Sequence, residues 1–95
     1  MPFALVGHGM LKITVVESSS EAVRLRVEGR LTGRWIEELQ RTCDMHALGE
    51  GVHLTLDLAD VSFADAAGIE LLKDLRNRLV TLLSPSTLVA EQLKA

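Results

Sequence analysis

Apolar and polar residues alternate along several segments of the chain, and a period of about two residues is typical of strands with one buried face. The alternation is strict in residues 23–28 (VRLRVE) and clear in residues 52–58 (VHLTLDL). Residues 11–17 (LKITVVE) mix apolar and β-branched residues, a composition that also favours a strand. Residues 18–20 are all serine, so a polar turn and a hairpin are predicted between residues 11–17 and 23–28.

Two other segments have the period of an amphipathic helix, with apolar residues three or four positions apart. Residues 34–47 place one group of such residues on a single face: Trp35, Ile36, Leu39, Cys43 and Ala47. A second helix is predicted to begin at Asp65, because an aspartate side chain can accept hydrogen bonds from the free amides of a first turn. Its buried face is predicted to contain Ile69, Leu72 and Leu75.

The remaining segments have weaker patterns. Residues 59–64 are predicted to form a connecting loop with Phe63 as its apolar anchor. Residues 79–83 (LVTLL) could either extend the second helix or form a short buried strand, and we predict the strand. Ser84 is then predicted to cap a last helix that has Pro85 in its first position. The faces of that helix are lined by Leu88, Val89, Gln92 and Leu93.

The predicted order is strand, strand, helix, strand, helix, strand, helix. This order indicates a single α/β domain with a mixed four-stranded sheet, mostly buried under the helices packed on it. Residues 1–10 show no clear period and contain Pro2, Gly7 and Gly9, so we expect a loose N-terminal arm before a domain that spans residues 11–95. A chain of 95 residues has room for one core.

Composition and charge exclude several classes of function. The net charge of −3 and the aromatic content of 3% disfavour binding to nucleic acid. Cys43 is the only cysteine, so an internal disulfide is impossible. No apolar stretch approaches the ~20 residues that span a bilayer, and the N-terminal residues lack the pattern of a signal peptide. We therefore expect a cytoplasmic protein without membrane insertion.

Several residues could take part in metal binding, catalysis or partner binding, but each has a simpler structural explanation. Cys43 and His46 are three positions apart on a helix and could both contact one metal ion, but no third ligand is evident and Cys43 lies on the apolar face. His53 alternates with the apolar set of its strand, so we expect it to point to solvent or to a helix end. Trp35 could anchor an interface, but core packing is the more frequent role. The sequence predicts no enzyme, no metal and no cofactor.

One segment carries a resemblance to a known family. Residues 55–72 (TLDLADVSFADAAGIELL) are similar to the signature of STAS domains, which occur in anti-sigma-factor antagonists and in the cytoplasmic parts of sulfate transporters. In that signature a strand ending in Asp-Leu leads through Val-x-Phe to Asp-Ser-Ser-Gly and then a helix. The matching residues here are Asp57, Leu58, Val61, Phe63, Asp65, Gly68 and Ile69. The resemblance extends more loosely over residues 11–95.

The resemblance implies a protein-binding module whose usual switch is missing. In the antagonists, a partner kinase phosphorylates the second serine of Asp-Ser-Ser-Gly, and the added charge releases the anti-sigma partner. Ala67 occupies that position here and Ala66 precedes it, so neither can accept a phosphate. Ser62 could be modified instead, but a turn serine usually bonds the backbone. The partner-binding surface implied by the resemblance contains Asp60, Ser62, Asp65, Ala66, Ala67, Gly68, Glu70 and Lys73.

Two kinds of partner fit this resemblance. The first is an anti-sigma factor of the ATP-binding serine kinase type. The alternative is a membrane transporter of the ABC type, for which the chain would be a soluble accessory subunit, as small STAS proteins are in lipid-transport systems. The sequence does not choose between these partners, and it leaves open whether the domain forms a homodimer.

Overall fold

The computed structural model describes residues 11–46 and 51–94. The predicted N-terminal arm and the predicted last residue of the first helix, Ala47, lie outside the described residues. The order of elements is the predicted one. In chain order they are β1 (Leu11–Ser18), β2 (Ala22–Leu31), α1 (Arg34–His46), β3 (His53–Ala64), α2 (Ala66–Asn77), β4 (Thr81–Leu83) and α3 (Thr87–Lys94).

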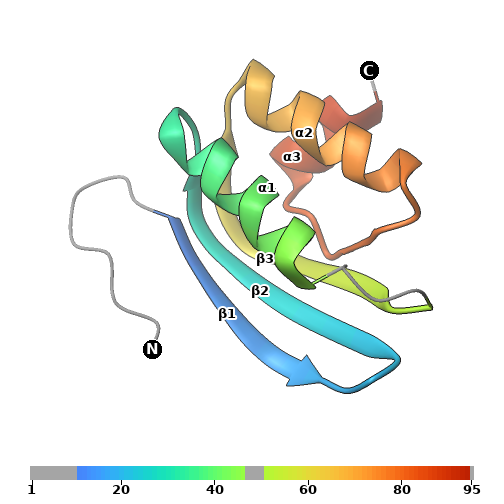
Figure 1. Cartoon of the computed structure of the whole chain (residues 1–95). Helices are drawn as coiled ribbons and strands as arrows, with labels where there is room; N and C mark the ends of the chain where they lie inside the picture. Colours follow the sequence, from blue (N-terminus) through green and yellow to red (C-terminus); the bar gives the residue numbers. More distant parts are fainter. Residues whose placement is uncertain (1–10, 47–50, 95) are drawn as a thin grey trace.

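The four strands form one mixed sheet in the order β1-β2-β3-β4. β1 and β2 are antiparallel, whereas β2 with β3 and β3 with β4 are parallel. Both crossovers, through α1 and α2, therefore step in the same direction along the sheet. Because such crossovers are almost always right-handed, α1 and α2 lie on the same face, and α3 joins them there (Figure 1).

None of the helices within residues 11–46 and 51–94 covers the other face of the sheet, so the described sheet is less buried than the sequence predicted. In β2, Arg24 and Arg26 alternate with buried residues and are exposed on this face. Val23, Leu25 and Val27 of the same strand are buried, as their alternation predicted. The core between sheet and helices contains Leu25, Val27, Leu39, Leu56, Leu58, Leu72 and Val89, all with no exposed surface.

The hairpin between β1 and β2 closes on Ser19. Its amide donates to the carbonyl of Ala22 at 2.8 Å, and its hydroxyl oxygen accepts from the amides of Glu21 and Ala22 at 3.2 and 3.1 Å. These bonds satisfy the backbone groups of the turn, which is the usual role of a turn serine. The predicted polar turn is confirmed.

The predicted loop at residues 59–64 is wrong, because β3 continues through these residues to Ala64. The pairing with β2 shifts register between Arg26 and Glu28 and again between Gly29 and Arg30. These irregularities interrupt the alternation, so the buried residues Val61 and Ala64 are three positions apart and do not look like a strand in the sequence. Phe63, the predicted anchor, is 36% exposed.

The boundaries near the C-terminus also differ from the prediction. The strand begins at Thr81, because Leu79 has a φ of 71° and belongs to the turn that ends α2. α3 begins at Thr87, and Ser86 caps it by accepting a hydrogen bond from the amide of Val89 at 3.3 Å. Ser84 has a φ of 53°, so both it and Pro85 precede the helix. Either serine fits the capping pattern, and only the turn geometry selects Ser86.

Candidate functional site

The start of α2 is fixed by a side-chain cap. Asp65 has extended backbone angles, and its Oδ1 accepts a hydrogen bond from the amide of Gly68 at 2.8 Å. An aspartate at this position also faces the positive end of the helix dipole. The cap predicted from the sequence is confirmed, and it accounts for Asp65 without any partner.

The same helix start lies directly against the end of β2. The amide of Asp65 donates to the carbonyl of Leu31 at 3.2 Å. Gly68 is buried, and a Cβ atom at this position would lie 2.6 Å from the Leu31 carbonyl oxygen. Only glycine therefore permits this approach without movement of backbone atoms. The first turn of α2 is held in a fixed place relative to the sheet.

Two alanines of this first turn, Ala66 and Ala67, are exposed. Further along the same helix, Glu70 is exposed and Lys73 is half-buried, while Ile69, Leu72 and Leu75 face the core as predicted. The helix thus presents a small apolar turn next to charged side chains. Any group that approaches this turn can come close to the backbone, because the methyl groups of alanine are short.

Asp60 and Ser62 point in a different direction from these alanines. Asp60 accepts hydrogen bonds from the Nε and Nη2 atoms of Arg26 at 3.1 and 2.5 Å, on the face of the sheet opposite the described helices. The hydrogen bond with Asp60 raises the pKa of Arg26 above its ordinary value. The hydroxyl of Ser62 donates to the carbonyl of Gly29 at 3.2 Å. The predicted surface therefore divides between the uncovered sheet face and the start of α2.

Two aromatic residues that the sequence did not assign to the site border the start of the helices. The guanidinium carbon of Arg30 lies 5.3 Å from the ring centroid of Phe63, just before the α2 cap. Arg34 lies over Trp35 at 5.1 Å at the start of α1, and Trp35 also packs against the core as predicted. Both distances are in the range of cation–π attraction. The pairing of Arg30 with Phe63 depends on the register shift at Gly29, so no sequence signal reveals it.

The other candidate residues lie apart from this site. Cys43 is buried, and burial raises the pKa of its thiol to about 12, which makes it unreactive as a nucleophile. The ring of His53 is exposed as expected and lies 2.7 Å from the hydroxyl of Thr81. Within residues 11–46 and 51–94, no group of three or more His, Cys, Asp or Glu side chains could hold a metal ion. No helix in the same part of the chain has the length and hydropathy that crossing a bilayer requires.

Comparisons with known proteins agree with this architecture. Residues 14–94 match a family model described as "Mlab, STAS domain". The fold matches the structure of the anti-sigma factor antagonist SpoIIAA in its unphosphorylated form, with a TM-score of 0.66 and 19% identity over 86% of this chain and 77% of that chain. A comparison with curated proteins found no significant match. Since the family model covers nearly all the described residues, this chain belongs to the STAS domain family.

Proposed function

We propose that this chain is a non-catalytic regulatory module of the cytoplasm that binds another protein through the start of α2. The proposed mode of action is that of an anti-sigma-factor antagonist, with an anti-sigma factor of the ATP-binding serine kinase type as partner. The likeness to SpoIIAA supports the fold on which this proposal rests. The partner class is inferred from the resemblance of residues 55–72 to the family signature.

The observation that carries the proposal is the exposure of Ala66 and Ala67 on a turn whose conformation is fixed by contacts within the chain. Asp65 satisfies the Gly68 amide, and Gly68 holds the turn against β2. Phe63, two residues before the cap, adds a partly exposed ring. A preformed turn with short side chains and one aromatic neighbour suits docking, because little conformational entropy is lost on binding.

The proposed module lacks the serine switch of the antagonists. Neither alanine carries a hydroxyl group, so a phosphate cannot be added at this turn. Ser62 is the nearest hydroxyl before the cap, and it bonds the Gly29 carbonyl. Binding would then be constitutive or set by the amount of protein. A phosphopeptide that contains Ser62, obtained after incubation with ATP and the captured partner, would contradict this part of the proposal.

An accessory subunit of an ABC-type transporter is the second candidate. Two observations favour it: the matching family model is the one named for Mlab, and a permanently docked subunit needs no phosphorylatable residue at its contact. The same turn of α2 would then contact a transporter subunit at the membrane.

Affinity capture with the wild-type chain and the Ala67→Glu variant tests both candidates. The substitution adds a charge and bulk at the proposed contact, yet a glutamate in the first turn is favourable for the helix. We expect the affinity of the variant for its partner to fall by a factor of about ten or more. Ser20→Glu is the matched control, because it adds the same charge at an exposed position in the β1–β2 turn, at the other end of the sheet.

The identity of the captured protein distinguishes the candidates. Recovery of an ATP-binding anti-sigma-type protein by the wild type and by Ser20→Glu, but not by Ala67→Glu, supports the antagonist function. Recovery of transporter subunits from the membrane fraction with the same dependence supports the second candidate. Equal recovery by all three chains would place the interface elsewhere.

A further inference from the structure

The ends of β2 and β3 lie side by side at one edge of the sheet. The two strands are parallel, and close to their ends Arg30 pairs with Phe63 and Leu31 with Ala64. α1 begins three residues after β2, and α2 begins two residues after β3. Both helices therefore start at the same edge (Figure 1). This edge includes the first turn of α2, through which we propose that the chain binds its partner.

Two exposed arginines of this edge each lie over an aromatic ring. The guanidinium carbon of Arg30, near the end of β2, is 5.3 Å from the centroid of the Phe63 ring. That of Arg34, the first residue of α1, is 5.1 Å from the ring of Trp35. An aromatic ring attracts a guanidinium through its quadrupole but carries no net charge. The rings therefore hold both side chains in place without neutralising them.

No carboxylate within the chain neutralises these two arginines either. Within residues 11–46 and 51–94, neither Arg30 nor Arg34 forms an ion pair. The carboxylate of Asp65, at the same edge, accepts the hydrogen bond of the Gly68 amide. Two more acidic residues, Glu37 of α1 and Glu70 of α2, are exposed, and neither pairs with these arginines.

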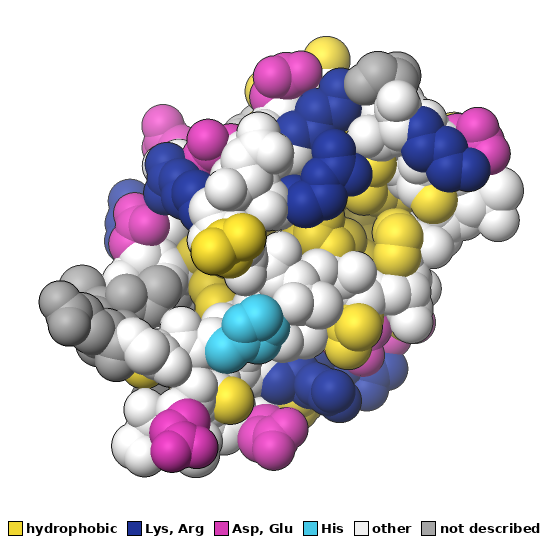
Figure 2. Space-filling view, turned by 90° about the vertical axis from the view of Figure 1, so that its right-hand side faces the viewer, with side chains coloured by type: hydrophobic (Ala, Val, Ile, Leu, Met, Phe, Trp, Pro, Cys, Tyr) yellow, Lys and Arg dark blue, Asp and Glu magenta, His cyan; other side chains and the backbone are white. Residues whose placement is uncertain are grey.

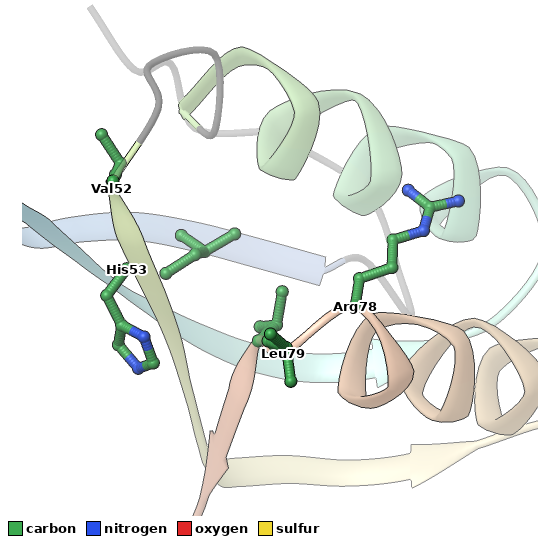
Figure 3. A pocket seen from close by; sticks show the side chains of 7 residues that line it. Val52, His53, Arg78 and Leu79 are labelled. Carbon is green, nitrogen blue, oxygen red and sulfur yellow. The ribbon is translucent and has the colours of Figure 1, made fainter.

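Arg78, beside the open hollow at the C-terminal end of α2, provides a contrast. Its guanidinium pairs with Asp74 at 2.9 Å and approaches Asp44 of α1 at 4.0 Å. In Figure 3 its side chain extends from the end of α2 toward α1. Figure 2, which shows the right-hand side of Figure 1, has basic and acidic side chains interspersed over this part of the surface. The charge of Arg78 is thus compensated within the chain.

We propose that the protein partner places an acidic segment on this edge, with carboxylates paired to Arg30 and Arg34 and an apolar side chain against the ring of Phe63. This inference rests on the proposed function, because it assigns a chemistry to the partner at the start of α2. A guanidinium that is already held over a ring loses little conformational freedom when it binds a carboxylate, and it can do so through two parallel hydrogen bonds. Arginine and aromatic residues are also enriched at protein interfaces.

The recognition is local rather than long-range. The whole chain has a net charge of −3, so its overall field does not attract an acidic protein. Pairing with the two arginines must supply the attraction at contact, and it should weaken as added salt screens the exposed charges.

Nuclear magnetic resonance titration of the isotope-labelled full chain with a short acidic peptide tests the proposal. The probe is acetyl-Glu-Asp-Leu-Glu-Asp-amide, and the matched control is acetyl-Gln-Asn-Leu-Gln-Asn-amide, which has the same side-chain shapes without the charges. We expect the backbone amide signals of residues 30–35 and 63–67 to shift with the acidic peptide. The neutral peptide should bind about ten-fold more weakly or not at all.

Two substitutions remove the charges with little change in size. Arg30→Gln and Arg34→Gln should each weaken binding of the acidic peptide by about three- to five-fold, and the double variant by about ten-fold or more. Both side chains are exposed, so the melting temperature should stay close to that of the wild type. Arg24→Gln is the matched control, because Arg24 is exposed on β2 and, among the described residues, has neither an ion pair nor an aromatic ring beside it.

Shifts that fall outside this edge, equal binding of the neutral peptide, or unchanged binding by the double variant would overturn the proposal. Affinity capture separates this result from the proposed function. A partner that is lost by Ala67→Glu but fully retained by the double arginine variant keeps the partner site and overturns the acidic segment. Binding of the acidic peptide at this edge, together with full capture by Ala67→Glu, supports the recognition of acidic groups and contradicts the proposed partner site.

Discussion

The two ends of α2 satisfy the rules of helix termination to different degrees. At the N-terminal end, Asp65 is a favoured capping residue in an extended conformation, and its carboxylate bonds the Gly68 amide. At the C-terminal end, the Schellman hydrogen bonds are present, but leucine occupies the left-handed position at 79. Local stability explains the first end fully. It does not explain the second, and departures of this kind are expected where a residue is retained for function.

The ends also differ in how they meet the rest of the molecule. Gly68 allows the first turn to lie against the Leu31 carbonyl, so the N-terminal end is in tight contact with β2. The C-terminal end borders an open hollow, whose walls include Val52, Leu54 and Arg78, and it exposes the apolar residue Leu79. One end is a rigid platform with short side chains, and the other is a projection beside a recess. The two ends of one helix therefore present different surfaces.

At the N-terminal end of α2, Gly68→Ala should cause the largest loss of stability. In an exposed helix this substitution would stabilise by about 1 kcal/mol, but here the new methyl group would clash with the Leu31 carbonyl oxygen. We expect the free energy of unfolding to fall by about 2–3 kcal/mol. Urea denaturation measures this value.

Gly51→Ala is the control for Gly68→Ala. Position 51 has a φ of 83°, and a methyl group added there would meet no atom within 4 Å, so the loss of stability reflects backbone conformation alone. We expect that loss to be about 1 kcal/mol. A Gly68→Ala variant as stable as the wild type would show that the start of α2 is not held against β2.

Asp65→Ala should have a smaller effect, because it removes a single cap. We expect a loss of about 1 kcal/mol in the free energy of unfolding, and less for Asp65→Asn, since asparagine also caps helices. Chemical denaturation and partner affinity should be measured together. Unchanged stability with reduced affinity would identify Asp65 as a recognition residue and contradict its assignment as a structural cap.

Arg78→Ala should have the smallest effect on stability. The side chain is 53% exposed, and its ion pairs with Asp74 and Asp44 are screened by water. We expect a loss of about 0.5 kcal/mol or less, which decreases further at high salt. Arg41→Ala, which breaks a similar exposed pair with Glu38 on α1, is the control. A loss well above that of the control would show that Arg78 closes the hollow as well as pairing on the surface.

Much of the fold could be predicted from local patterns. Alternation identified β2 and the first part of β3, and helical spacing placed Leu39, Cys43 and Leu72 in the core. The prediction failed where backbone irregularity changes the spacing. β3 continues through residues 59–64 because bulges let Val61 and Ala64 face the core three positions apart, and the last helix starts at Thr87 because Ser84 has left-handed angles.

For the candidate site, the Asp65 cap and the lack of a hydroxyl group at positions 66 and 67 could be predicted from the sequence, because both depend on residue identity at neighbouring positions. The pairing of Asp60 with Arg26, the contact of Arg30 with Phe63 and the hollow beside Leu79 could not be predicted, because they form only in the folded chain. Periodicity assigns a residue to one side of its own element. What the side chain meets there depends on strand register and helix packing, which join residues far apart in the chain.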